Sequence, residues 1–302
     1  MTSTIIPKRR EFMKKIIIGC LSVLLLNSYA EDQYPEDRQY TSSDKGYTQY
    51  GAPSLHKTGK YALTYDDGPH PTRTAIILDH LKDANAKATF FIITSNVNDS
   101  NFYLVKRMLD EGHIVGSHGS VHDNSNLISK TEWKTKVKKS FQDLKAIYQK
   151  AGHELKDLYY RFPYAAYGER KDHHHMNTLK EISQELTNGN CIQFAFWDFD
   201  SSDWVPGMTA KEVEENFIAS NEGGRYITYK TVKNGQGQRT QIKKIVDITS
   251  PISGGVLLQH DIQASSVEGT KLILDYVKKQ NLQIIRLDEV IEFAPKQDCR
   301  PM

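Results

Sequence analysis

Short apolar runs alternate with helix-like segments along most of the chain. The runs are rich in β-branched and aromatic residues, as is typical of strands, and they cover residues 60–65, 88–93, 113–118, 159–164, 193–200, 254–260 and 282–287. Apolar positions at helical spacing fill gaps between them, at residues 72–86, 102–112, 129–149 and 267–280. This alternation predicts parallel βαβ units, which form either a (β/α) barrel or an open sheet.

The clearest predicted helix covers residues 129–149. Ser129 and Glu132 have the spacing of a capping box at its start. Gly152 follows its last apolar positions and is a typical stop signal. We therefore expect one long helix here, with its apolar side against the sheet.

The first thirty residues differ from the body of the chain. Residues 13–30 carry a Lys-Lys pair, a short apolar stretch and a small-x-Ala ending, which is typical of a secretory signal peptide. The apolar stretch is well short of the roughly twenty residues that span a bilayer. We expect residues 1–30 to be cleaved after Ala30, with Met13 as an alternative start, and no stable membrane anchor. The protein would then be exported, to the periplasm or out of the cell.

The rest of the chain divides into three parts. Residues 31–58 are polar and lack periodicity, so we expect a linker or strap. Residues 59–295 are enough for one barrel-sized domain, and residues 296–302 form a C-terminal tail. Two cysteines, Cys191 and Cys299, remain after export, and they either form one disulfide or stay free thiols.

Charge argues against a nucleic-acid partner. The whole chain has a net charge of +2, but residues 1–30 hold five cations and one acid, which leaves −2 on residues 31–302. A chain with this balance lacks the basic surface that binds nucleic acid. The sequence leaves the oligomeric state open.

Reactive side chains gather at the carboxyl ends of the predicted strands: Asp66, Asp67, His118, Arg161, Asp203 and His260. Ligands bind parallel sheets at this edge, so we expect these residues to share one rim. Consecutive strand residues point to opposite faces. The turn at Gly68-Pro69 must therefore redirect one aspartate if both carboxylates are to face the rim.

Two histidines supply possible partners for Asp67. His118 and His122 lie four residues apart, so a helical turn or tight loop could aim both rings at one metal ion. Three such ligands leave an open position for water, as in catalytic zinc sites. Non-haem iron oxygenases use the same ligand types, so the set alone leaves the chemistry open. Residues 172–175, DHHH, follow a polar loop, and we expect them to be exposed.

Five motifs in this order resemble those of the NodB-homology polysaccharide deacetylases, carbohydrate esterase family 4. They are TYDDGP at residues 64–69, HGSVH at 118–122, RFPY at 161–164, DSSDW at 200–204 and LQH at 258–260. The resemblance covers about residues 59–294. With it, the predicted fold is α/β, a distorted and incomplete (β/α) barrel of about seven parallel strands.

The resemblance implies a metal ion and a base. Asp67, His118 and His122 would bind a divalent ion, with zinc expected first and Co²⁺ or Ni²⁺ as alternatives. This ion would polarise an acetyl carbonyl and activate water. Asp66 would be the general base, and Arg161 would orient it and keep it ionised.

The resemblance also implies an acid and a substrate pocket. His260 would protonate the leaving amine, with Asp203 holding its ring. The backbone N–H of Tyr164 would face the oxyanion. Leu258 and Trp204 would form the wall around the acetyl methyl group.

Three features depart from the family pattern. Gly119 stands where the family usually has Ser or Thr, and the residues after Tyr164 lack the Gly that is common there. The connection from Trp204 to His260 is long, and its residues 225–246 predict an inserted β-hairpin around an Asn234-Gly235 turn. This hairpin either contacts or gates a polymer, or is a solvated addition without a substrate role.

The sequence therefore predicts a secreted, metal-dependent hydrolase that removes acetyl groups from N-acetylglucosamine residues of a glycan polymer. Peptidoglycan is favoured because of the predicted export, ahead of poly-N-acetylglucosamine and chitin oligomers. An acetylxylan esterase is a close alternative, and an inactive glycan-binding module is an alternative of another class. A two-carboxylate glycosidase is disfavoured, because adjacent aspartates cannot stand about 5 Å apart across a glycosidic bond.

Overall fold

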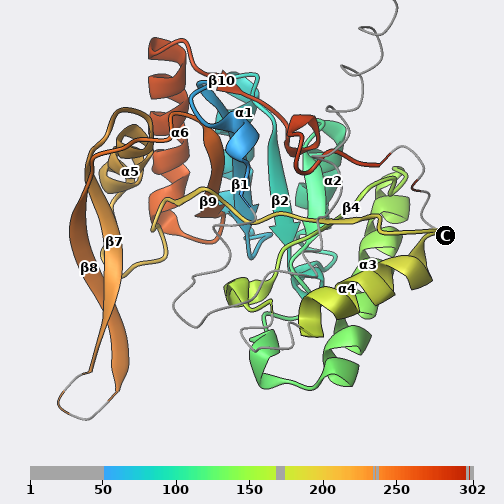
Figure 1. Ribbon diagram of the computed structural model, residues 1–302. Coiled ribbons are helices and arrows are strands. Elements are labelled where there is room, and N and C mark those ends of the chain that lie inside the picture. Colours follow the sequence, from blue (N-terminus) through green and yellow to red (C-terminus); the bar gives the residue numbers. More distant parts are fainter. Residues whose placement is uncertain (1–50, 168–173, 234, 236–237, 297–298, 300–302) are drawn as a thin grey trace, which may run out of the picture. The chain divides into compact units, whose positions relative to one another are not determined.

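The computed structural model describes residues 51–167, 174–233, 235, 238–296 and 299. The predicted signal peptide and most of the predicted linker lie outside these residues. Within them, one parallel sheet has the strand order β5-β4-β3-β2-β1-β9-β6, and β10 also pairs with β1. The strands are β1 Lys60–Asp66, β2 Ala88–Ile92, β3 Ile114–Ser117, β4 Leu158–Tyr160, β5 Ile192–Phe194, β6 Phe199–Asp200, β9 Gly255–His260 and β10 Gln283–Ile284 (Figure 1).

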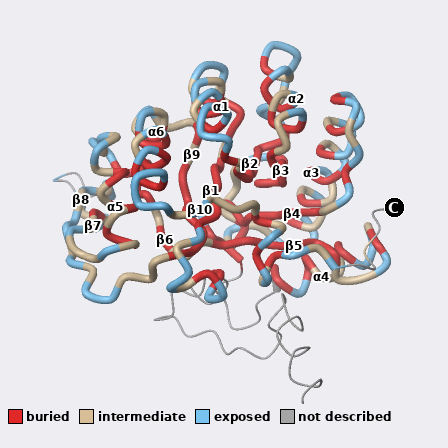
Figure 2. The backbone as a smooth tube through the Cα atoms, turned by 90° about the horizontal axis from the view of Figure 1, so that it is seen from above, coloured by how far each residue is buried: buried red, intermediate tan, exposed pale blue. Residues whose placement is uncertain are grey.

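Helices follow most of the strands and pack against one face of the curled sheet. They are α1 Arg73–Asp83, α2 Phe102–Asp110, α3 Lys130–Ala151, α4 His174–Leu186, α5 Ala210–Glu222 and α6 Ala264–Lys279. Figure 2 shows α6, α1, α2 and α3 in an arc outside the strands. The sheet ends at β5 on one edge and β6 on the other, and these two strands do not pair. The prediction of an incomplete (β/α) barrel is thus confirmed. None of the helices described is long and apolar enough to cross a bilayer.

Strand β1 is buried on both faces. Tyr61, Leu63 and Tyr65 belong to the core between the sheet and the helices, whereas Ala62 belongs to a second cluster on the inner face. Successive side chains of a strand point to opposite faces, so Thr64 and Asp66 share the inner face with Ala62. The apolar outer positions hold the strand in place, and the inner positions are left for polar chemistry.

Helix α3 begins and ends as predicted, but its predicted capping box is only half formed. The Ser129 hydroxyl accepts a hydrogen bond from the Glu132 N–H at 3.2 Å, and Gly152 ends the helix with a φ of 83°. A left-handed residue at this position favours glycine. The side chain of Glu132 pairs with Lys136 at 2.9 Å.

The apolar run at residues 193–200 is not one strand, so that prediction was wrong. It divides into β5 and β6, which lie on opposite edges of the sheet. The backbone between them crosses the inner side, where the carbonyls of Ala195 and Phe196 accept hydrogen bonds from Arg161. A buried cation with several donors needs acceptors, and this crossing supplies two of them.

Two further predictions need correction or completion. His175 is fully buried in α4, with its ring 4.9 Å from that of Trp133, so this histidine is not exposed as predicted. Asp172 and His173 lie outside the described residues. Cys191 and Cys299 form a disulfide, with Cα atoms 5.4 Å apart. It links the segment before β5 to the end of the chain.

The predicted insertion is a β-hairpin. Strand β7, Gly224–Lys233, pairs antiparallel with β8, Arg239–Ile248, and the two form a sheet of their own. The predicted turn residue Asn234 lies outside the described residues. The hairpin runs beside α5 and past the edge of the main sheet where the strands end (Figure 1).

Candidate active site

Strand register brings the two central reactive residues together. Asp66 and His260 are the last residues of β1 and β9, and they are direct partners across these two parallel strands. On the other side of β1, the Arg161 N–H donates to the Ser117 carbonyl at 3.0 Å, which continues the pairing of β4 with β3. The residues that follow these strands therefore lie on one rim, as the sequence predicts.

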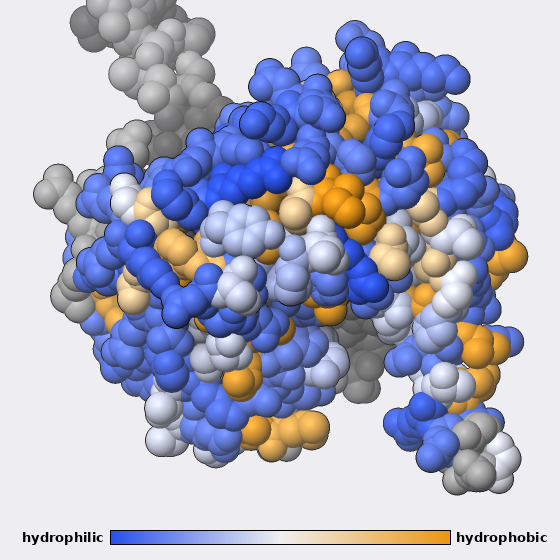
Figure 3. Space-filling model, turned by 180° about the vertical axis from the view of Figure 1, so that it is seen from behind, coloured by the Kyte–Doolittle hydropathy of each residue, from blue (hydrophilic) through white to orange (hydrophobic). Residues whose placement is uncertain are grey.

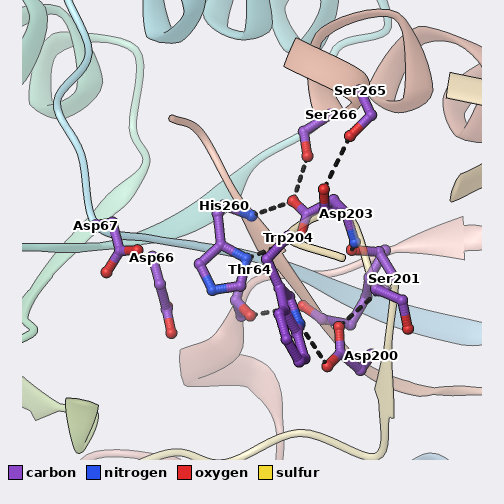
Figure 4. Close-up of polar contacts among 12 residues, drawn as sticks. Thr64, Asp66, Asp67, Asp200, Ser201, Asp203, Trp204, His260, Ser265 and Ser266 are labelled. Atoms are coloured by element: carbon purple, nitrogen blue, oxygen red, sulfur yellow. Dashed lines mark hydrogen bonds and ion pairs between the residues drawn. The ribbon is translucent and has the colours of Figure 1, made fainter. Parts of the chain in front are cut away.

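The turn after β1 presents two carboxylates to this rim. Asp66 points to the inner face, and Asp67 has a φ of 78°, a left-handed conformation that reverses the strand's alternation. Figure 4 shows both side chains pointing the same way from this turn. Gly68 is required next to them, because a Cβ there would lie 2.1 Å from Asp261 Oδ2.

Asp67, His118 and His122 form a three-residue cluster. Asp67 Oδ1 lies 3.4 Å from His118 Nε2 and 3.3 Å from His122 Nε2, and the three ligand atoms lie within 4.8 Å of one another. His118 Nδ1 donates to the Arg161 carbonyl at 2.9 Å. This bond leaves Nε2 of His118 as the unprotonated, metal-binding nitrogen.

The cluster fits a divalent metal ion. Asp67 Oδ1 is buried and has no hydrogen-bond partner among the described residues, which is costly unless a cation faces it. Burial lowers the pKa of His122, although Asp67 opposes this effect. A neutral ring is the form that binds metal. One carboxylate oxygen and two imidazole nitrogens are the ligand types of catalytic zinc sites.

Arg161 holds Asp66 from below the rim. Its guanidinium is fully buried and donates to Asp66 Oδ1 at 2.9 Å and to Thr64 Oγ1 at 2.7 Å. The Ala195 and Phe196 carbonyls accept its other bonds, at 2.7 and 3.1 Å. The ring of Phe91 lies 4.2 Å from the guanidinium carbon. Burial lowers the pKa of Arg161 and the charge of Asp66 opposes that shift, but an arginine stays charged in proteins.

His260 is paired with Asp203 in a similar way. Its Nδ1 donates to Asp203 Oδ1 at 2.8 Å, and its backbone N–H donates to Asp203 Oδ2 at 2.6 Å. The Ser266 hydroxyl also donates to Oδ2. Burial lowers the pKa of His260, but Asp203 outweighs it and raises the pKa to about 10, with help from Asp67 and Asp66. Figure 4 shows the His260 ring between Asp203 and these two aspartates.

The remaining predicted site residues surround this centre. The Tyr164 backbone has a φ of 57°, and its N–H has no acceptor within the described part of the chain. Tyr164 is 62% exposed, and its ring lies 4.4 Å from that of His122. Leu258 is buried two residues before His260. Trp204 is held by Asp200, whose Oδ2 accepts its indole N–H at 3.0 Å.

The departure at Gly119 has a structural reason. This residue has a φ of 91°, and a Cβ on it would lie 2.9 Å from the Val121 carbonyl oxygen. Its N–H donates to Ser117 Oγ at 3.1 Å, and its carbonyl accepts from the Thr94 N–H at 3.1 Å. The loop between the two histidines is thus built on a conformation that favours glycine.

Sequence reasoning missed several supporting residues. Thr64 stands inside the first motif, but nothing in the sequence indicates its bond to Arg161. Ser266 lies in the first turn of α6. Its position in the sequence is consistent with a helix start but gives no indication of its contact with Asp203. Tyr229 of the hairpin packs its ring 4.6 Å from that of Trp204. The Asn-Gly turn signal predicts the hairpin, but it cannot predict what the strand touches.

Comparisons with known proteins agree with the resemblance to this family. A family model described as polysaccharide deacetylase matches residues 56–181. A peptidoglycan-N-acetylglucosamine deacetylase of Bacillus cereus is 30% identical over 234 residues, which cover 76% of this chain and 70% of that relative. The chain therefore belongs to the polysaccharide deacetylase family. The first curated relatives are matched over 66% and 40% of their own lengths, so the chain spans two thirds of them or less.

Solved structures share the fold. A crystal structure of a peptidoglycan N-acetylglucosamine deacetylase, in complex with an N-hydroxybenzamide, is similar with a TM-score of 0.59 and 25% identity, over 82% of this chain and 94% of that one. A family 4 acetyl xylan esterase from Clostridium thermocellum, in complex with a cobalt ion, has a TM-score of 0.53 and 24% identity, over 76% of this chain and 89% of that one. The latter likeness shows the fold alone.

Proposed function

We propose that this protein is a metal-dependent deacetylase that removes acetyl groups from N-acetylglucosamine residues of peptidoglycan. The observation that carries the proposal is the pairing of Asp66 with His260 across β1 and β9, beside the Asp67, His118 and His122 cluster. A candidate base, a candidate acid and a metal ligand set thus share one rim. The Bacillus cereus relative named for this activity supports the same substrate.

Asp66 acts as the general base. Arg161 engages its Oδ1, and its Oδ2 lies 3.8 Å from His118 Nε2, on the side of the metal ligands. This oxygen takes the proton from the attacking water. A divalent ion held by Asp67, His118 and His122 would supply Lewis-acid polarisation of the carbonyl and a lower pKa for water.

His260 acts as the general acid. Because Asp203 holds Nδ1, the other ring nitrogen carries the proton that faces the rim. The raised pKa keeps this ring protonated at neutral pH. It donates the proton to the leaving nitrogen as the carbon–nitrogen bond breaks.

The substrate's acetyl group is held by the remaining residues. The Tyr164 N–H donates to the oxyanion of the tetrahedral intermediate, and Leu258 and Trp204 enclose the methyl group. Water's oxygen forms the new bond to the carbonyl carbon, the amide bond breaks, and the products are acetate and a free amino sugar. Each proton is accounted for by Asp66 and His260.

Acetate release from purified protein tests this proposal. Intact peptidoglycan, chitin oligomers and acetylated xylan are offered in parallel, with the protein treated with chelator and then resupplied with zinc, cobalt or nickel. We expect release from peptidoglycan that stops with chelator and returns with metal. Faster release from acetylated xylan than from peptidoglycan would contradict the proposal and would indicate an acetylxylan esterase. No release from any substrate by folded, metal-loaded protein would favour a glycan-binding module.

We also propose that the protein is exported to the periplasm or out of the cell. The support is the sequence of residues 13–30, which has the layout of a signal peptide. N-terminal sequencing of the protein recovered from periplasm and medium should begin at Glu31. Recovery of the uncleaved chain in the cytoplasm alone would contradict this.

A further inference from the structure

The β7–β8 hairpin is attached to the fourth motif. The Tyr226 hydroxyl donates to the Asp200 carbonyl and accepts from the Asp200 N–H at 3.2 Å. The Tyr229 ring meets that of Trp204 edge to face, with ring centres 4.6 Å apart. At the base, Asn216 of α5 holds Ile227 through both backbone groups. The hairpin is therefore anchored beside the site and its position is defined there.

One face of the hairpin continues outward from Trp204. Side chains alternate along each strand, and the register pairs Tyr229 with Lys243, Thr231 with Gln241, and Lys233 with Arg239. These residues therefore share one face, from the base toward the tip. Lys233 lies four residues beyond Tyr229, which is about 13 Å along a strand. Seen from behind, the outer half of the hairpin stands clear of the rest of the surface (Figure 3).

The hairpin is strongly basic in an otherwise acidic domain. Residues 224–248 hold six cations and one acid, a net charge of +5, whereas the rest of residues 31–302 carries −7. Arg225 and Lys243 pair with acids of α5. The other four cations have no ion-pair partner among the described residues: Lys230, Lys233, Arg239 and Lys244. Such charges attract an anionic partner.

We infer that this face of the hairpin is an additional binding surface for a glycan strand that carries carboxylates. Tyr229 is 39% exposed, and its ring packs against that of Trp204. The ring offers an apolar face for a sugar next to the one being deacetylated. Lys233 and Arg239 at the tip bind carboxylates farther along the strand. The inference rests on the proposed function, since it takes the substrate to be a glycan polymer at this rim.

The test compares two double variants with the same change in charge. Lys233→Ala with Arg239→Ala removes the cations on the proposed face, and Lys230→Ala with Lys244→Ala removes those on the opposite face. We measure kcat/KM for acetate release from peptidoglycan and from neutral chitin oligomers. The kcat/KM for peptidoglycan divided by that for chitin oligomers should fall about tenfold in the first double variant. Most of this fall should come from a higher KM for peptidoglycan, as expected for charges at the rim of an interface. The same ratio should stay within about twofold in the second.

A second variant addresses the aromatic contact. Tyr229→Ala should raise KM for both polymers about fivefold, and Tyr229→Phe should restore it, because the ring and not the hydroxyl makes the contact. Equal ratios in both double variants, or a normal KM in Tyr229→Ala, would overturn the inference.

Binding without turnover separates this inference from the proposed function. The protein is sedimented with insoluble peptidoglycan at low salt and at about 0.5 M salt, where charge attraction is screened. Wild-type protein should sediment at low salt only, and the Lys233 and Arg239 double variant should stay in solution. If no acetate is released but this pattern holds, the proposed function fails and the binding surface stands. If the wild-type protein does not bind, the inference fails.

Discussion

Two ion pairs, Asp66 with Arg161 and His260 with Asp203, lie at the same rim. They differ in whether the cation of the pair can lose its charge. In the first, Asp66 is the partner that faces the rim and Arg161 is the support behind it, and both side chains are buried. In the second, His260 faces the rim and Asp203 is the buried support; the side chains of Arg161 and Asp203 are both 0% exposed. The supporting group is fully inside in each case. The same kind of pair can therefore produce a base or an acid, depending on which member reaches the rim.

The difference has an energetic consequence. Arginine cannot give up its proton in a protein, so Arg161 without Asp66 would remain a buried unpaired cation. Histidine can become neutral, so His260 without Asp203 has a low-cost alternative state. The first pair should therefore matter more for stability, and the second should respond to pH.

Asp66→Asn should have the largest effect. The variant loses the proposed base, so kcat should fall by about 10²–10⁴-fold. It also leaves Arg161 unpaired, which should lower the free energy of unfolding by about 3–5 kcal/mol. Rates, denaturant unfolding and metal content are measured together. Metal content should be unchanged, because Asp67, His118 and His122 are intact; activity within tenfold of wild type would contradict the assigned base.

Arg161→Lys tests whether charge alone is enough in the first pair. A lysine keeps the charge but cannot reach four acceptors in a fixed plane. We expect a loss of about 10–100-fold in kcat/KM and about 2–3 kcal/mol in stability. Arg107→Lys, which disturbs bonds to Asp79, Glu111 and the Ala75 carbonyl away from the rim, is the control; it should lose stability but keep kcat/KM. If Arg161→Lys is fully active, the positive charge alone, without the geometry of the guanidinium, is enough to support Asp66.

Asp203→Asn tests the pH response of the second pair. Without the carboxylate, burial dominates and the pKa of His260 should fall from about 10 to below its ordinary value. The alkaline limb of the pH–rate profile should move to lower pH, with a loss of about 10–100-fold at pH 8 that shrinks toward pH 5. An unmoved alkaline limb would show that another group sets it.

The same pair gives a prediction for stability. The pKa of His260 is higher in the folded protein than in the unfolded chain, so its contribution is fully present below the unfolded pKa of about 6.5. It is lost as the pH rises through about 10. Unfolding free energies between pH 6 and pH 10 should therefore fall less steeply in Asp203→Asn than in wild type. Equal slopes would contradict the raised pKa.

Ser266→Ala should have the smallest effect and sharpens the comparison. It removes one of the hydrogen bonds to Asp203 Oδ2 and leaves the carboxylate in place. We expect a loss of about threefold in kcat and about 1 kcal/mol in stability. Thr64→Val, which removes the matching hydroxyl beside Arg161, should cost more stability because it leaves a buried charged donor unsatisfied. The reverse order would show that Asp203 is held more tightly than Arg161.

Much of the site could be predicted from the sequence, because each motif is local. The turn at Gly68-Pro69, the spacing of His118 and His122, and the capping pattern of α3 depend on residues a few positions apart. Their positions at strand ends then predict one rim, since parallel strands end at the same edge. The α/β class and the hairpin followed from such local patterns, and the family and the incomplete barrel followed from the resemblance of the five motifs; all are confirmed.

Tertiary packing decided the rest. Only the register of β1 with β9 makes Asp66 and His260 neighbours, and register depends on contacts between residues that are nearly two hundred positions apart. The run at residues 193–200 is split between two strands, and its middle supplies carbonyl acceptors to the buried Arg161, which no pattern within the run could reveal. His175 was buried by Trp133, and Tyr229 was placed against Trp204. The sequence by itself determined which chemistry the chain carries, and the tertiary structure determined which side chains share it, because contact through space is not encoded in spacing along the chain.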